Sequence, residues 1–320
     1  MIRRILSLLD PFVLALIGTV VLASALPARG GFANLVSVVA YAGIVLLFFL
    51  HGAKLSREAL VAGARNWRLH VAVLVVTFVV FPLIGLGFGA IGALPPEFAA
   101  GLLFLTLLPS TVQSSIAFTA IARGNVAAAV CAATFSNFIG IFATPALVAL
   151  LMGGEAGGVS WTSVRTIVLQ LLLPFVVGHM LRPWIGAFVA RHKTLTARVD
   201  RGSILLVVYA AFGAAVVEGL WSRVAPASLL VLAGLCLALL ALVMGLTVAL
   251  GRSMGLSHED AVVLLFCGSK KSLATGVPMA GVLFPAASVG GVLLPVMVFH
   301  QLQLIACALL APRLARRVDD

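Results

Sequence analysis

Charged residues are scarce in this 320-residue chain: they make up only 10% of it, whereas hydrophobic residues make up 62%. Water-soluble globular domains contain about 25% charged residues. The mean hydropathy of +1.20 leads to the same reading. The composition therefore excludes a soluble globular protein and indicates a membrane protein.

Metal-ligand spacing is also lacking. The four cysteines, Cys131, Cys236, Cys267 and Cys307, all lie within apolar runs, and none is spaced like a metal ligand. We interpret them as packing residues. The sequence thus predicts no cofactor and no metal site built from cysteine.

The apolar runs lack the alternation of polar and apolar residues that barrel strands require. Each run has about 20 residues, which is enough to cross a bilayer as a helix. We therefore expect an all-α polytopic membrane protein with ten transmembrane helices. Their approximate limits are 11–27, 35–52, 69–93, 98–122, 126–152, 163–187, 203–221, 226–250, 259–284 and 288–312. The longest polar connection, 186–202, falls between spans six and seven.

The positive charges fall on one side of this arrangement. Of the 21 Lys and Arg residues, 15 precede span one, follow span ten, or lie in the connections after even-numbered spans, and Arg182 near the end of span six brings this side to 16. The positive-inside rule then places both termini in the cytoplasm. The net charge of +11 is explained by topology, so we expect a lipid bilayer as partner and no nucleic acid.

Ten spans form two halves of five, and an odd number inverts the second half. We expect one transmembrane domain over residues 1–320, with repeats at about 11–152 and 163–312. The fourth span of each half has a polar centre, "LPSTVQSS" and "CGSKKS". Paired interruptions at matching positions are typical of the binding site of a secondary transporter. We predict breaks near Pro109–Gln113 and Cys267–Lys271; the alternative is a kinked packing face of small residues.

The stretches "FCGSKKSLATGVPMAG", "LPSTVQSSIAF", "TFSNFIGIFATPAL" and "ILLVVYAAF" resemble the bile acid:sodium symporter family over essentially the whole chain. The similarity is greatest to its bacterial SBF-like branch, which is related to member seven of solute carrier family 10. The resemblance implies a panel of spans 1, 2, 6 and 7, and a core of spans 3–5 and 8–10 in which broken spans four and nine cross.

Sodium-coupled members of that family bind two sodium ions near the crossing, and the resemblance implies where their ligands would fall here. The Glu and Gln of span nine fall on Phe266 and Lys270, and the Gln of span three falls on Thr77. The Ser-Asn pair falls near Ser114 and Ser115. Two hydroxyl positions fall on Ala129 and Ala133. Since the carboxylate is missing, we expect weak or absent sodium coupling.

Lys270 and Lys271 are adjacent cations inside an apolar span. A charge at the bilayer centre costs about 3 kcal/mol or more, so each lysine needs a reason to be there. One reading is that a lysine replaces the sodium ion or contacts an anionic substrate. The other is that it neutralises the C-terminal end of a half-helix. Neighbours on a helix point about 100° apart, so each lysine can serve a different role.

Other polar residues are candidates for the substrate or ion site. They are Ser269, Ser272, Gln113, Ser114, Ser115, Thr77, Asn137, His300 and Gln301. Histidine can carry protons near neutral pH. For His300, Gln301 and Asn137, the alternative is a hydrogen bond between packed helices.

The leading hypothesis is a secondary transporter of a small organic anion in the cell membrane, working by alternating access. The alternative is a regulatory membrane protein linked to calcium homeostasis, which the resemblance to eukaryotic relatives implies. A Ser-Lys hydrolase dyad at Ser269 or Ser272 is the third reading. We do not favour it, because near-adjacent residues rarely meet in the required geometry.

Overall fold

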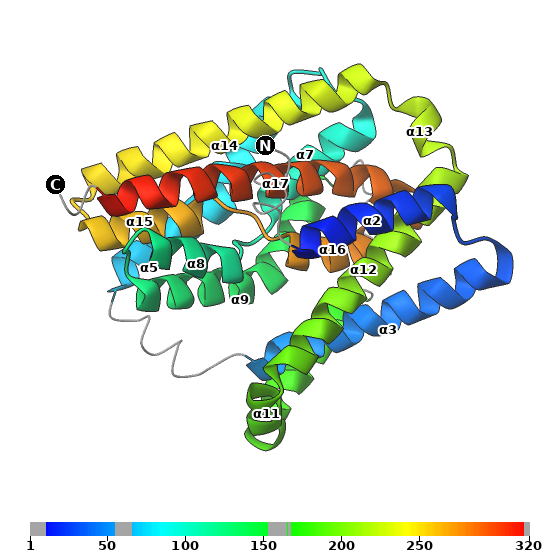
Figure 1. Ribbon diagram of the computed structural model, residues 1–320, viewed down its shortest axis with the longest axis horizontal. Coiled ribbons are helices and arrows are strands. Elements are labelled where there is room, and N and C mark those ends of the chain that lie inside the picture. The colour runs from blue at the N-terminus through cyan, green and yellow to red at the C-terminus, as the bar shows by residue number, and fades with distance from the viewer. Residues whose placement is uncertain (1–10, 55–65, 153–164, 166–167, 317–320) are drawn as a thin grey trace. The chain divides into compact units, whose positions relative to one another are not determined.

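The computed structural model describes residues 11–54, 66–152, 165 and 168–316. Within these ranges all regular structure is helical (Figure 1). The elements are α2 (Pro11–Ala25), α3 (Gly30–Lys54), α5 (Trp67–Val75), η2 (Val76–Val80), α6 (Phe81–Gly89), α7 (Pro96–Leu107), α8 (Gln113–Ile121), α9 (Val126–Leu151), η3 (Val168–Leu172), α11 (Leu173–Arg191), α12 (Lys193–Val217), α13 (Leu220–Arg223), α14 (Pro226–Ser253), α15 (His258–Gly268), α16 (Leu273–Leu283) and α17 (Ala286–Arg316).

Seven helical stretches in the described residues are long and apolar enough to cross a membrane. They are Gly30–Lys54, Trp67–Gly89, Val126–Leu151, Val168–Arg191, Lys193–Val217, Pro226–Ser253 and Ala286–Arg316. Two shorter apolar helices are Leu14–Ala25 and Pro96–Leu107. The chain is therefore an all-helical, multi-pass membrane protein.

The connection between spans six and seven differs from the expectation. We expected a polar loop over residues 186–202, but α11 runs to Arg191 and α12 begins at Lys193. Only His192, with φ −103° and ψ 45°, separates the two helices. The segment contains Ala, Leu, Lys and Arg, which favour helix, and neither Gly nor Pro lies between Gly186 and Gly202. The helices thus extend beyond their apolar segments. The start of the expected sixth span, before residue 168, lies mostly outside the described residues.

The chain divides into two compact units. Unit 1 consists of Met1–Leu55, Val148–Ala225 and Val277–Leu293, and unit 2 consists of Ser56–Leu147, Pro226–Gly276 and Leu294–Asp320. Each unit is therefore assembled from segments that are distant in the sequence.

In unit 1, α3 packs against α11 and α12. Two glycines bring α3 and α11 together: a Cβ added at Gly52 would lie 2.0 Å from the carbonyl oxygen of Phe175. A Cβ added at Gly178 would lie 2.0 Å from the carbonyl oxygen of Phe49. Since such distances are far inside van der Waals contact, the two backbones approach as only glycine allows.

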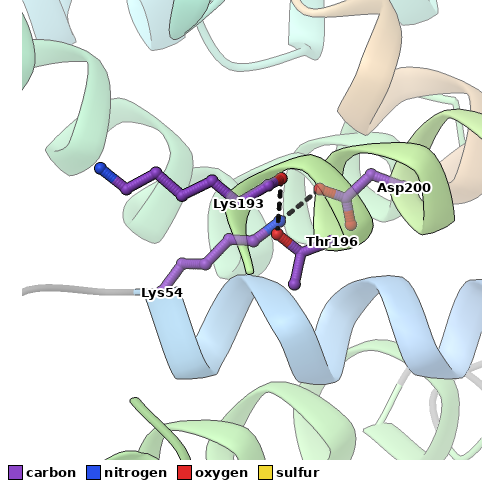
Figure 2. A network of polar contacts seen from close by, with 4 residues as sticks. All are labelled: Lys54, Lys193, Thr196 and Asp200. Carbon is purple, nitrogen blue, oxygen red and sulfur yellow. Dashed lines mark hydrogen bonds and ion pairs between the residues drawn. The ribbon is translucent and has the colours of Figure 1, made fainter. Parts of the chain in front are cut away.

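Polar contacts connect α12 to two other segments of unit 1. Near its start, the Lys54 ammonium pairs with the Asp200 carboxylate, and Thr196 Oγ1 donates to the Lys193 carbonyl (Figure 2). Further along the helix, the Tyr209 hydroxyl donates to the carbonyl of Leu26 at 2.8 Å. The Lys54–Asp200 pair ties α12 to the end of α3, and the Tyr209 bond ties it to the residue after α2.

In unit 2, one carboxylate joins three segment ends. Asp260, in the first turn of α15, accepts hydrogen bonds from the side-chain amides of Asn66 at 2.8 Å and Asn125 at 3.0 Å. The Asn125 Oδ1 in turn accepts from the backbone N–H of Ala128, which caps α9. The starts of α5, α9 and α15 are thus fixed together.

We expect Gly178→Ala to destabilise unit 1, because the added methyl group overlaps the Phe49 carbonyl and forces α3 and α11 apart. Overpacking of this kind costs about 1–3 kcal/mol, sometimes more. The matched control is Gly18→Ala, since a Cβ at Gly18 meets nothing within 4 Å. Thermal unfolding in detergent should show a lower midpoint for Gly178→Ala and an unchanged or higher one for Gly18→Ala. Equal midpoints for both variants would contradict the close packing.

Candidate functional site

The first helix interruption in unit 2 lies between α7 and α8. Helix α7 ends at Leu107, Leu108 is extended with φ −74° and ψ 154°, and α8 begins at Gln113. The cause is Pro109, whose ring disfavours the helical region for the preceding residue. The break covers 108–112, one residue earlier than the Pro109–Gln113 predicted from the sequence.

The second interruption lies between α15 and α16. Helix α15 ends at Gly268, and α16 begins at Leu273. No proline lies in this break. The Ser269 hydroxyl bonds back to the Leu265 carbonyl at 2.5 Å. The Ser272 hydroxyl accepts from the N–H of Thr275, as an N-cap does. The break covers 269–272, whereas the sequence predicted Cys267–Lys271, because the helix continues through Gly268.

The two interruptions contact each other. The backbone N–H of Ser272 donates to the Pro109 carbonyl at 2.8 Å. A Cβ added at Gly276 would lie 2.5 Å from Leu108 Cδ1. Backbone groups freed by one break therefore bind those freed by the other.

The Lys271 ammonium binds backbone carbonyls at this contact between the two interruptions. Its Nζ donates to the carbonyl oxygens of Thr77 at 2.7 Å, Thr106 at 2.8 Å and Leu108 at 2.7 Å. Its Nζ also lies 4.2 Å from the centroid of the Phe81 ring, which adds a cation–π contact. The side chain is 1% exposed. Thr106 and Leu108 lie at the C-terminal end of α7, where the helix dipole favours a cation.

The remaining carbonyls of the first interruption are bound by side chains or by the second interruption. The Thr144 hydroxyl donates to the Leu107 carbonyl at 2.7 Å, and the Asn137 amide donates to the Ser110 carbonyl at 2.8 Å. With the Lys271 and Ser272 bonds, each carbonyl from Thr106 to Ser110 has a donor. This matters because an unsatisfied buried carbonyl costs about 1–3 kcal/mol.

Lys270 has different surroundings. Its Nζ makes one hydrogen bond in the described part of the chain, to the Ser114 hydroxyl at 3.1 Å. It lies 4.4 Å from the centroid of the Phe118 ring and 5.8 Å from that of Phe266. The residue is 0% exposed. Two of the three donors of a lysine ammonium therefore have no acceptor among the described residues.

A hydroxyl and amide network adjoins the lysines. Asn137 Oδ1 accepts from the Thr275 hydroxyl at 3.0 Å, and Thr275 Oγ1 lies 3.0 Å from Ser272 Oγ. Thr111 Oγ1 lies within hydrogen-bond distance of both Ser114 and Ser115. The network joins α8, α9 and α16 around the contact of the two interruptions.

The structure brings most of the predicted candidates together. Lys270, Lys271, Ser272, Ser114 and Asn137 all bond within or next to the two interruptions, as described above. Ser115 donates to the Phe266 carbonyl at 3.0 Å. Thr77 contributes its carbonyl rather than its hydroxyl, which bonds to Val73 O.

Four candidates do not share these contacts. Gln113 is exposed, and the Ser269 hydroxyl is used by its own helix. His300 bonds to Gln303 at 2.8 Å. Gln301 Nε2 is buried and has no hydrogen-bond partner within the described ranges.

Gln303 is a residue that sequence reasoning missed. Its Oε1 accepts from the Lys271 N–H, and its Nε2 donates to the Lys271 carbonyl, both at 2.9 Å. Gln303 therefore holds the peptide groups of the second interruption as a neighbouring strand would. Thr144 and Thr275 were missed as well. Gln303 follows His300 by three residues, which places the two on one helix face, and this spacing was the available signal.

A multi-pass helical protein with two interrupted helices in contact has the construction of a secondary transporter. Comparison with known proteins agrees: the chain belongs to the SBF-like CPA transporter family, whose model matches residues 10–316.

Three relatives illustrate the range of this family. An uncharacterized protein of Pseudomonas aeruginosa is 55% identical over 314 residues, covering 97% of this chain and 94% of the relative. The "Putative symporter YfeH" of Escherichia coli strain K12 is 50% identical over 319 residues, covering 99% of this chain and 96% of the relative. The "Sodium/bile acid cotransporter 7" of Danio rerio is 26% identical, covering 89% and 86%. The family and these names indicate transport rather than an enzyme activity.

We expect Lys271→Met to destabilise the protein severely, because three buried carbonyls lose their donor and each loss costs about 1–3 kcal/mol. The control is Lys193→Met, which removes an exposed lysine. Thermal unfolding and the yield of folded protein in detergent measure the difference. A Lys271→Met variant as stable as Lys193→Met would show that the three hydrogen bonds are dispensable.

Proposed function

We propose that the chain is a secondary active transporter that moves a small organic anion by alternating access, without sodium coupling. The observation that carries this proposal is the contact of two interrupted helices with two buried lysines beside it. Interrupted helices place helix-end partial charges and free backbone N–H and C=O groups where a substrate binds. These groups are kept away from the lipid.

The proposed architecture has ten spans in two inverted repeats. Counting α2 and the two interrupted pairs, α7 with α8 and α15 with α16, together with the seven long stretches gives ten spans. Unit 2 holds most of the residues expected for the core, spans 3–5 and 8–10, but not the end of span five from Val148 or the stretch Val277–Leu293 of spans nine and ten. Unit 1 holds those expected for the panel, together with Val277–Leu293. This division supports a mechanism in which core and panel move against each other.

The charge of the site favours a negative substrate. Helices α8 and α16 begin within unit 2, and the first turn of a helix presents N–H groups and a partial positive charge. Lys270 hydrogen-bonds to Ser114 in the first turn of α8 and adds a full charge there when protonated. The name of the Danio rerio relative mentions bile acid, so amphipathic carboxylates and sulfonates are the first candidates.

The contacts of Lys271 support the proposed absence of sodium coupling. Sodium binding needs several oxygen ligands, and backbone carbonyls freed by helix breaks commonly provide them. Here three such carbonyls are already bound by the Lys271 ammonium. Phe266 is buried where the resemblance places a Glu, so no carboxylate replaces it. The ammonium would hold the place of the coupling ion permanently.

The location of the protein is proposed from its charges. We place it in the cell membrane, with both termini in the cytoplasm, because most Lys and Arg residues lie on the side of the termini. A regulatory role in ion homeostasis was the alternative, and the transporter names of the relatives do not favour it.

We expect organic anions to raise the unfolding temperature of the purified protein equally in sodium and potassium buffers. The probes are potassium taurocholate, potassium benzenesulfonate and potassium succinate, each with either KCl or NaCl. Uptake of the stabilising anion into proteoliposomes would then show transport. A saturable stabilisation or uptake that requires sodium would overturn the sodium-independent mechanism, and stabilisation without any flux would favour the regulatory role.

A further inference from the structure

The two adjacent lysines differ in what their hydrogen bonds require. Carbonyl oxygens accept hydrogen bonds but cannot donate them. Lys271 Nζ contacts three carbonyls at 2.7–2.8 Å, so all three protons of an ammonium are used. A neutral amine has only two protons, and it would leave one carbonyl facing a nitrogen lone pair. The geometry therefore requires Lys271 to stay protonated.

Lys270 has no such requirement. Its one partner is the Ser114 hydroxyl, and a hydroxyl can both donate and accept. A protonated Lys270 donates to Ser114, and a neutral Lys270 can accept from it. A neutral amine also keeps two N–H groups, so Lys270 can go on donating to Ser114 without any change in the hydrogen bonds of Thr111 and Ser115. Losing a proton at Lys270 breaks no hydrogen bond.

The surroundings of Lys270 leave both forms accessible. Burial at 0% exposure disfavours the charged form, whereas the Phe118 ring at 4.4 Å favours it. The titratable groups that face Lys270 are the thiols of Cys267 on α15 and Cys307 on α17. The neighbouring Lys271 ammonium carries a like charge. No carboxylate in the described part of the chain pairs with Lys270 to fix its charge.

We propose that Lys270 is an exchangeable proton-binding site, and that its proton is the coupling ion of the anion transport proposed above. In one conformation, a hydronium ion on that side of the membrane donates a proton to the Nζ lone pair and leaves as water, and the resulting ammonium pairs with the bound anion. After the conformational change the ammonium returns that proton to water on the other side, and the neutral amine resets. One proton moves with each anion, and no other charge is created. This inference rests on the proposed function for the transport step, but not for the proton binding itself.

The proton-binding site can be tested without transport. Arginine keeps its proton in proteins, so Lys270→Arg retains the charge and removes the exchange. We expect the unfolding temperature of the parent, relative to Lys270→Arg, to rise as the pH is raised toward about 10, below the pKa of an unfolded lysine. The reason is that an unfolded lysine holds its proton throughout this range, so that unfolding takes up a proton wherever the folded protein has released one. The maximum effect is about tenfold in the folding equilibrium constant per pH unit.

Lys270→Met provides the second comparison, because methionine fits an apolar site and does not titrate. The parent should gain stability with pH relative to Lys270→Met over the same range, and this comparison stands even where Lys270→Arg fails to fold. Parallel pH curves for the parent and the folded variants would overturn the inference, since Lys270 would then keep a constant charge.

The coupling is tested in proteoliposomes that contain a pH-sensitive dye. Potassium benzenesulfonate is a suitable probe, because a sulfonate does not cross the bilayer as a neutral acid. With the parent protein, the interior of the proteoliposomes should become more acidic as the anion enters. With Lys270→Arg, anion entry should no longer be accompanied by this acidification. Anion entry without acidification would overturn proton coupling and leave the proposed function standing. If no tested anion enters, the transport proposal fails for these anions, and the stability curves alone decide whether Lys270 binds an exchangeable proton.

Discussion

Backbone carbonyls freed inside a membrane-spanning helix need hydrogen-bond donors, because the lipid supplies none. Unit 2 is arranged around this constraint. Pro109 ends α7 and exposes carbonyls from Thr106 onward, and their donors come from other segments that fold back on the break. Lys271 binds two of them together with the Thr77 carbonyl, while Thr144 and Asn137 of α9 bind two more. The position of each surrounding segment is therefore coupled to the same short stretch.

The dependence is mutual, since the second interruption is held by the same neighbours. Ser272 donates its N–H to Pro109, Gln303 of α17 bonds to both sides of the Lys271 residue, and Ser115 of α8 binds the Phe266 carbonyl. Each break therefore makes hydrogen bonds to the other. A network of this kind is rigid when every member is satisfied and costly when one is missing, so the contact behaves as one cooperative element.

The sequence was sufficient for the helical class and for the approximate place of both breaks, because Pro109 and the polar clusters are local signals. It did not predict the donors. Thr144 and Gln303 lie 37 and 32 residues from the groups they bind, and nothing local distinguishes them from other polar residues in apolar helices. Gln113 has a strong local signal, its place in a polar break, yet it is exposed. The sequence did not predict that α11 and α12 continue through residues 186–202. The charged residues there were interpreted as a loop, although Ala, Leu, Lys and Arg favour helix.

The order of the two lysines accounts for their different surroundings. The N–H of Lys271 is held by Gln303, and its side chain reaches toward the carbonyls at the end of α7. Lys270, one residue earlier, points to the start of α8. One cation therefore lies at the negative end of a half-helix, where its charge is stabilised. The other lies near the positive end of a half-helix, where its charge is opposed. A covalently attached ammonium such as Lys271 cannot be carried across the membrane, so it cannot transmit the energy of an ion gradient. Of the two lysines, only Lys270 has hydrogen bonding that permits its charge to change.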